Sequence, residues 1–220
     1  MAIEDRTDRF RKPTGHVHKR SAMSAMALPA MLLLEQVGLF PGAAQWAAEA
    51  VEQLKKRRDQ VVSSQDPTEA VANRIGSTFP VLHGAHAMGS TAAKHWKTQI
   101  NLNAKTLALS ATYPDLCHGE VSAWGQNGDV TRQLFTLVNL RHDAEHPQVS
   151  RSFELVSEAL REVVAGIVEV RAEGESDLAQ LLDLCMFGDF VSLHLARDSG
   201  VDPGPVPAVS DLASQLGSTA

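Results

Sequence analysis

The residues best suited to chemistry lie in a polar loop at residues 115–120, directly after Tyr113 and Pro114. The loop contains His118 and ends on Glu120, a carboxylate beside the flexible Gly119. A carboxylate and a histidine on a loop between rigid elements occupy the position where α/β proteins usually keep their chemistry. This loop is therefore the first candidate for a functional site.

A second pair of chemically active side chains, His142 and His146, lies four residues apart in the sequence. That spacing can hold zinc when both histidines are on one helix. Here they follow an apolar stretch that is typical of a strand, and His146 precedes Pro147. We therefore expect no metal at this pair, and no other group of the nine histidines has a zinc spacing.

The elements around the loop at residues 115–120 should position it. Apolar side chains at helical spacing, with lysines between them, predict a helix over residues 92–108. The residue before a proline is pushed out of the helical region, so the helical pattern must end before Pro114. Residues 121–124 (VSAW) are typical of a strand.

Further along the chain, strand patterns alternate with helix patterns. Strands are expected at residues 79–84, 121–124, 132–141 and 166–170, and helices at 150–162 and 177–198, with a short helix ending near residue 216. Such alternation predicts a mostly parallel sheet with helices on both faces, a doubly wound α/β fold.

The first third of the chain is predicted to be helical. Helices are expected over residues 20–34, 42–62 and 67–76, the last with Asp66 as N-cap and Pro67 in its first turn. The basic residues 55–58 should form a solvated face near the C-terminal end of the second helix. We divide the chain into a helical linker or dimerisation segment at residues 1–75 and an α/β domain at residues 76–220.

Composition excludes several classes of partner. The chain has 26 acidic and 20 basic residues, which gives no general attraction to nucleic acid or to an anionic membrane. Its longest uncharged apolar run, residues 21–34, is shorter than the roughly 20 residues that span a bilayer. Acidic residues stand where a signal peptide would be basic, and only two cysteines occur, so a reduced cytoplasm is expected.

A family resemblance follows from three short motifs. They are Asn103-Ala104-Lys105, Tyr113-Pro114 and His118-Gly119-Glu120. Together they resemble the core motif of bacterial and archaeal bifunctional phosphoglucose/phosphomannose isomerases, sugar isomerase (SIS) domain proteins whose pattern is N-x-N/E-A-K followed by P-E-x-N-H-N-E. The chain departs from that pattern at Asp115 and Gly119.

More distant stretches extend the likeness to about residues 13–216. Residues 20–22 with 38–39 resemble the linker helix of the family, residues 140–147 its L-R-D-x-x-x-H-P segment, and residues 187–192 with 201–203 its D-x-x-S and D-P-T-P region. The resemblance covers only the second half of such isomerases, so a first SIS domain is missing from this sequence. A homodimer is expected, because helices that look buried would otherwise leave apolar surface uncovered.

The resemblance implies roles for particular residues. Aldose–ketose isomerisation needs a base that reaches C1 and C2, a group that opens the sugar ring and a cation near the enediolate. It implies Glu120 as the base, His146 (or else His142) for ring opening across a dimer interface, and Arg20 beside the enediolate. His118 and Lys105 are expected to bind the sugar phosphate. No cofactor is implied.

Simpler structural roles remain open for these residues: Glu120 can cap a turn, His146 can be an ordinary loop histidine, and Arg20 can form a salt bridge at a helix start. Departures from the family also bear on activity. Gly204 replaces the threonine of D-P-T-P, and the lysine expected in the last helix is absent. The phosphate cradle belongs to the first SIS domain, although Ser90 and Thr91 at an expected helix start could bind a phosphate through backbone N–H groups.

Three functions are consistent with this sequence. The first is a C-terminal SIS domain that isomerises glucose 6-phosphate or mannose 6-phosphate to fructose 6-phosphate, with little turnover from this chain alone. The second is a non-catalytic domain that binds a carbohydrate phosphate or serves in assembly. The third is a purely structural partner domain, which would neither bind nor convert sugar phosphates.

Overall fold

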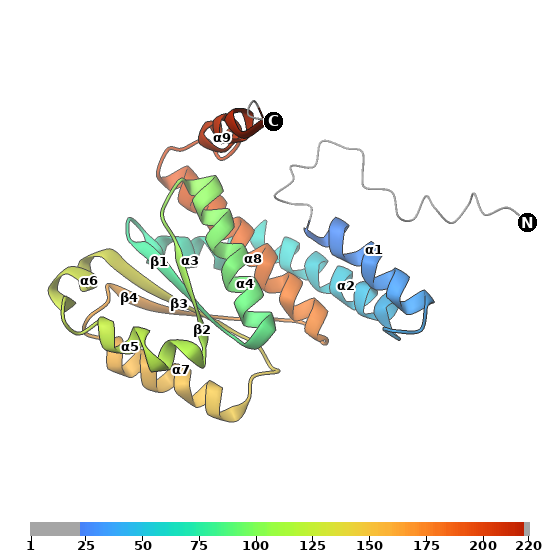
Figure 1. Ribbon diagram of the computed structural model, residues 1–220, viewed down its shortest axis with the longest axis horizontal. Coiled ribbons are helices and arrows are strands. Elements are labelled where there is room, and N and C mark those ends of the chain that lie inside the picture. The colour runs from blue at the N-terminus through green and yellow to red at the C-terminus, as the bar shows by residue number, and fades with distance from the viewer. Residues whose placement is uncertain (1–22, 218–220) are drawn as a thin grey trace, which may run out of the picture.

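A four-stranded parallel sheet forms the centre of the protein, in a computed structural model that describes residues 23–217 (Figure 1). The strand order is β2-β1-β3-β4. The strands are β1 (Phe79–Ala85), β2 (Leu109–Tyr113), β3 (Phe135–Arg141) and β4 (Gly166–Arg171). All three neighbouring pairs are parallel, which confirms the doubly wound α/β prediction.

Helices surround this sheet and extend from it. Their bounds are α1 (Met23–Gln36), α2 (Ala43–Val61), α3 (Pro67–Ile75), α4 (His86–Gln99), α5 (Glu120–Ala123), α6 (Gly128–Leu134), α7 (Pro147–Leu160), α8 (Asp177–Asp198) and α9 (Pro207–Gly217). A π-helical segment (Ile100–Ala104) continues α4, and a 3-10 helix (Asp115–His118) follows β2. The predicted N-cap of α3 is confirmed: the Asp66 side chain accepts a hydrogen bond from the Thr68 backbone N–H.

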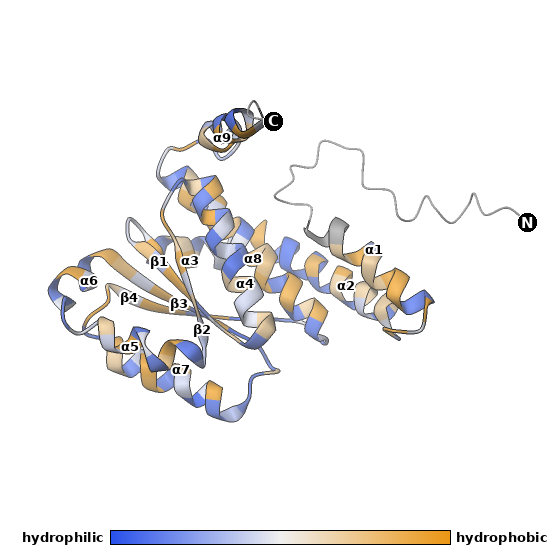
Figure 2. Ribbon diagram, in the orientation of Figure 1, coloured by the Kyte–Doolittle hydropathy of each residue, from blue (hydrophilic) through white to orange (hydrophobic). Residues whose placement is uncertain are grey.

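Successive side chains along a strand point to opposite faces of the sheet, so the apolar residues form two cores, one on each face. Leu82 and Val138 point to one face and pack with α3, α4 and α8, where Trp96 is fully buried. Val81 and Leu137 point to the other face, which α7 covers. Figure 2 shows the apolar strands at the centre and helices of mixed character around them. The face under α7 also carries His83 and Tyr113.

Helix α8 is the main core helix. Within residues 23–217 it alone has the length and apolar composition that a membrane crossing requires, and 67% of that apolar stretch is buried inside the protein. A core helix that is apolar nearly all round meets the same criteria. Its predicted bounds, residues 177–198, agree with the structure.

Helix α2 packs on α8 through a buried polar contact, which corrects one expectation. Lys55 and Arg58 are exposed as expected, but Arg57 is buried and its Nη2 lies 2.8 Å from Asp183 Oδ2. The Asp183 carboxylate is fully buried and also accepts from Gln53. The basic cluster at residues 55–58 is therefore not a uniformly solvated face, because one of its members anchors α2 to α8.

The helix predicted at residues 92–108 is too long. Helix α4 ends at Gln99, the π-helical segment ends at Ala104, and Lys105 turns the chain in a left-handed conformation with φ 54°. Leu107, one of the apolar residues whose helical spacing led to that prediction, is 55% exposed. Residues 109–113, to which the sequence assigned no element, form β2 by pairing with β1.

The strand prediction at residues 121–124 is wrong, and the one at residues 132–141 begins too early. Residues 120–123 form the short helix α5, and Trp124 packs edge-on against Phe135 with ring centroids 5.6 Å apart. Residues 132–134 belong to α6, and β3 begins at Phe135. Four apolar and small residues do not distinguish a strand from a helical turn, and here they cover the sheet rather than join it.

Candidate active site

Glu120 begins α5 and extends its side chain toward the sheet. Its Oε1 lies 3.1 Å from Nε2 of His83 on β1, and 32% of the Glu120 side chain is exposed. Among the described residues, His83 is the hydrogen-bond partner of this carboxylate. The side chain of Glu120 therefore joins α5 to the centre of the sheet instead of capping its own turn.

His83 is held rigidly inside the fold. β1 lies between β2 and β3, and His83 is in register with Ala111 and Asn139. Its side chain is only 1% exposed, and its ring lies edge-on to Tyr113 with centroids 5.8 Å apart. Burial raises the pKa of Tyr113 well above its usual value, so this neighbour stays uncharged.

A hollow opens beside Glu120. Its volume is about 340 Å³, and it lies between the start of β2, α5 and the start of β3. Its lining is largely apolar and consists of Val81, Leu109, Ser110, Glu120, Ala123, Trp124, Thr131 and Phe135. Glu120 is the one ionisable residue in this lining, and no lysine or arginine is among the described residues that form it. The hollow thus offers a carboxylate and two aromatic side chains, but no positive charge that would bind a phosphate.

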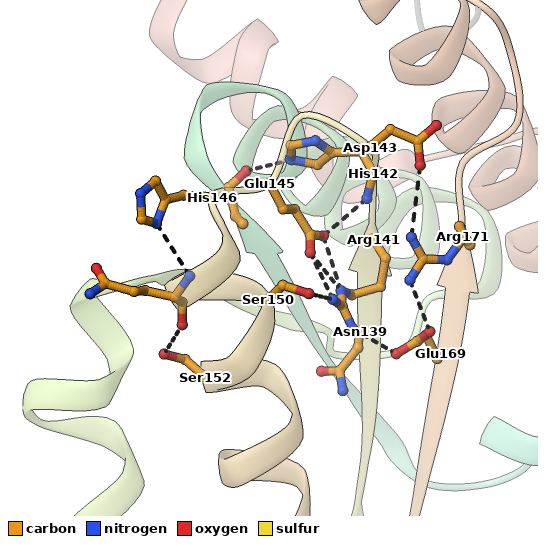
Figure 3. Close-up of polar contacts among 12 residues, drawn as sticks. Asn139, Arg141, His142, Asp143, Glu145, His146, Ser150, Ser152, Glu169 and Arg171 are labelled. Carbon is orange, nitrogen blue, oxygen red and sulfur yellow. Dashed lines mark hydrogen bonds and ion pairs between the residues drawn. The ribbon is translucent and has the colours of Figure 1, made fainter.

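The histidines after β3 occupy a different place, at the carboxyl end of the sheet (Figure 3). His142 is buried, and its Nε2 lies 3.2 Å from the Ala85 carbonyl oxygen. His146 is exposed and caps α7: its Nδ1 accepts a hydrogen bond from the Gln148 backbone N–H. Neither contact involves Glu120. The structure brings His83, not His146 or His142, to this carboxylate within one chain.

An ion-pair network around the buried Arg141 fixes the loop that carries these two histidines, as Figure 3 shows. Arg141 contacts Glu145 with Nη2 2.7 Å from Oε2, and its Nη1 lies 2.9 Å from Glu169 Oε2. Burial alone would lower the pKa of Arg141, but hydrogen bonds and charge from Glu145 outweigh it, and the pKa is raised. This arginine is therefore a structural cation whose single charge is paired with two carboxylates.

Within the described part of the chain, neither His118 nor Lys105 makes a hydrogen bond or ion pair with Glu120. His118 is exposed at the end of the 3-10 helix after β2, whereas Lys105 precedes β2 and its Nζ donates to the Leu102 carbonyl. These two residues therefore stand at opposite ends of the same strand. Arg20 lies outside the described residues.

Ser90 is in the second turn of α4, so its backbone N–H is used within the helix. The prediction that Ser90 and Thr91 stand at a helix start and could bind a phosphate through backbone N–H groups is therefore wrong.

No group of three or more histidine, cysteine, aspartate or glutamate side chains in residues 23–217 is arranged to hold a metal.

Sequence reasoning missed His83 as a site residue. The available signal was its polarity inside an otherwise apolar strand, FPVLHGA. A buried polar side chain needs a partner, and Glu120 is that partner.

The fold and motifs agree with a known family. Residues 64–216 match the family model of the bacterial phospho-glucose isomerase C-terminal SIS domain. The chain belongs to this SIS-domain family. The match includes Glu120, His83 and the histidines after β3, and it begins before α3.

Two curated relatives of this SIS domain have similar sequences. Both are named bifunctional phosphoglucose/phosphomannose isomerase: one from Caldicellulosiruptor bescii is 25% identical over 98% of this chain, and one from Aquifex aeolicus is 29% identical over 76%. The matched regions span 64% and 51% of those proteins. The chain thus corresponds to part of the length of its relatives.

Solved structures agree on the SIS fold. A glucose-6-phosphate isomerase-like protein from Thermus thermophilus superposes with a TM-score of 0.63 at 20% identity, covering 81% of this chain and 61% of that protein. A glucosamine-6-phosphate deaminase from Thermotoga maritima gives a TM-score of 0.57 at 11% identity, covering 85% of this chain and 54% of that protein. At these identities the likeness supports the fold alone.

Proposed function

We propose that this chain is the proton-transferring half of a phosphoglucose/phosphomannose isomerase. Membership of the isomerase C-terminal SIS family supports this proposal. The observation that carries it is the Glu120 carboxylate, one-third exposed beside a hollow and held by a buried histidine. A general base must be fixed in place and still reachable by substrate, and Glu120 has both properties.

In the proposed reaction, the Glu120 carboxylate takes the C2 proton of an open-chain aldose 6-phosphate. The electron pair of that C–H bond forms the enediolate as the C1 carbonyl oxygen takes up the negative charge. The C2 hydroxyl proton then passes to the C1 oxygen, and Glu120 returns its proton to C1 to give the ketose. No lysine or arginine lines the hollow at Glu120. The groups that bind the phosphate and the cation that stabilises the enediolate must therefore come from elsewhere. We assign the phosphate cradle to a first SIS domain outside the sequence given and the cation to Arg20.

In this proposal, a second copy of the chain supplies a residue that Glu120 lacks within its own chain. We place His146 in the site of a second copy, where it would serve ring opening, because within one chain it lies apart from Glu120. His118 and Lys105 are assigned to substrate binding on the family motif alone. Residues 1–75 act as the helical linker to the first domain, and two free cysteines favour the reducing cytoplasm.

A second function, binding without turnover, is favoured by the last part of the chain. Gly204 stands where the family has a threonine, and its N–H bonds to Asp202 Oδ1 at 2.7 Å in an exposed turn. The turn therefore supplies no hydroxyl. In this alternative the domain keeps the fold and holds a carbohydrate phosphate for assembly.

A coupled assay on glucose 6-phosphate and mannose 6-phosphate, with thermal melting in parallel, separates the two functions. Turnover that disappears in Glu120→Gln supports the isomerase, and a matched Glu154→Gln change on the exposed side of α7 should leave it intact. Stabilisation by either sugar phosphate with no turnover supports the binding domain. If the sugar phosphates are not turned over and do not stabilise the protein, both proposals are contradicted and a structural partner domain remains.

A further inference from the structure

We propose that His83 is the positioning residue of this site, and that its Nε2–H holds the Glu120 carboxylate in the orientation that proton transfer needs. This inference rests on the proposed function and adds a residue from β1 that lies outside the motif around Glu120. His83 touches the base and not the substrate. Its effect must therefore appear in the rate of proton transfer more than in substrate binding.

The need for such a residue follows from the weakness of α5. This helix has four residues, and its N-cap residue Gly119 provides no side-chain cap. A base on so short an element is free to change rotamer unless another element holds it. The centre of the sheet is the most rigid support available, and β1 is hydrogen-bonded on both sides there.

The direction of the hydrogen bond follows from the surroundings of the ring. An ionised carboxylate accepts hydrogen bonds and donates none, so Nε2 must carry the proton that joins the pair. The other ring nitrogen, Nδ1, is buried with no hydrogen-bond partner. A proton on Nδ1 would add a buried donor without an acceptor, which is costly. The geometry therefore favours the neutral Nε2–H tautomer.

The same contact leaves one carboxylate oxygen for chemistry. His83 occupies Oε1 at 3.1 Å, which leaves Oε2 to take the substrate proton. Tyr113 and Phe153 pack behind the histidine with ring centroids 4.0 Å apart, so the imidazole cannot swing away. Since a 1 Å misplacement of a reacting group can cost on the order of 100-fold in rate, loss of this support should be visible kinetically.

Imidazole ¹⁵N NMR of the wild-type chain tests the contact itself. We expect His83 to show a protonated Nε2 and a bare Nδ1, and to change its signals in Glu120→Ala. A proton on Nδ1 with none on Nε2, the other neutral tautomer, would overturn the proposal, because that ring could not donate to Glu120. This measurement needs no variant of His83, so it decides the tautomer even if such a variant fails to fold.

Solvent deuterium exchange at C1 of fructose 6-phosphate tests the functional role. The C1 proton leaves to Glu120 and deuterium returns, so the exchange reports proton transfer without the ring-opening steps of the full cycle on an aldose. His83→Phe should lower the maximal exchange rate by about 10- to 100-fold with little change in the half-saturating concentration. His83→Gln, which restores an N–H at similar reach, should recover most of that loss.

His95→Phe is the matched control, because His95 Nε2 makes a comparable contact of 2.7 Å with Asp189 Oδ1 away from the hollow. It should melt at a lower temperature and exchange at the wild-type rate. Equal rates in His83→Phe and wild type would overturn the positioning role. Wild-type protein that shows the Nε2–H tautomer but no exchange would instead overturn the proposed function.

Discussion

At the scale of single residues, the pair of Arg57 with Asp183 is a buried contact that joins the first third of the chain to the domain. Burial would lower the pKa of Arg57, but the hydrogen bonds and charge of Asp183 outweigh it and the pKa is raised. Asp183→Ala would leave a buried guanidinium without its main partner. We expect a loss of about 3–5 kcal/mol in the free energy of unfolding, measured by urea denaturation.

Asp59→Ala is the control for that change. Asp59 pairs with the neighbouring Arg58 on the exposed face of α2, where such pairs contribute about 0–1 kcal/mol. If both variants lost equal stability, the buried pair would not be the anchor of α2.

Asp66 is a single residue that makes the free energy of unfolding depend on pH. Burial would raise its pKa, but hydrogen bonds from Thr68 and the pairing with His194 outweigh it, and the pKa is lowered. A depressed pKa contributes stability that is present above the unfolded value of about 3.9 and is lost as pH falls through the folded value.

Asp66→Asn keeps a good N-cap and removes this titration. The free-energy difference between wild type and Asp66→Asn, measured by urea denaturation between pH 7 and pH 2, should therefore narrow as the solution becomes acidic. A difference that stays constant over this range would contradict the assignment.

At the scale of elements, α8 and α4 approach so closely that a glycine is required between them. A Cβ at Gly188 would lie 2.4 Å from the Trp96 ring, and the Trp96 Nε1–H donates to the Leu184 carbonyl at 2.7 Å. Gly188→Ala should therefore destabilise the protein by about 1–3 kcal/mol in thermal melting, although alanine favours helix formation.

Gly125→Ala is the matched change, because a Cβ added at Gly125 would have no other atom within 4 Å. It should leave the melting temperature close to that of wild type. A melting temperature for Gly188→Ala at or above that of wild type would show that α8 can shift away from Trp96.

Elements with strong local signals could be predicted from sequence. Helix α8 is apolar over most of its length, and α3 has Asp66 and Pro67 at its start, so both were correctly bounded. β2 was missed because its LSATY sequence has little strand character, and its conformation depends on pairing with β1. α5 was mistaken for a strand because four residues carry too little periodicity to decide.

Only part of the candidate site could be predicted from the sequence. Glu120 follows from its motif, but its partner His83 is 37 residues earlier in the chain, and only the sheet brings the two together. The lesson is that a polar residue inside an apolar strand should be treated as a candidate partner for a nearby carboxylate.

At the scale of the whole molecule, apolar side chains remain uncovered in a single chain. Val209, Leu212 and Leu216 are 55–66% exposed on α9, which projects from the end of α8 in Figure 1. Leu39, after α1, is 74% exposed. Surface of this kind usually belongs to an interface.

We therefore predict a homodimer, to be measured by light scattering at micromolar concentration as twice the chain mass of 23.7 kDa. Leu212→Glu together with Leu216→Glu should shift the mass toward that of the monomer if α9 contributes to the interface. A wild-type monomer would contradict the dimer and remove the route by which His146 reaches a second site.

The central claim is that Glu120 moves a substrate proton. Its most direct test is deuterium incorporation at C1 of fructose 6-phosphate in D₂O, followed by proton NMR with the whole chain as catalyst. Incorporation should be faster than without protein and should fall by at least about 100-fold in Glu120→Gln, with Glu154→Gln equal to wild type. Incorporation that persists in Glu120→Gln would contradict the claim.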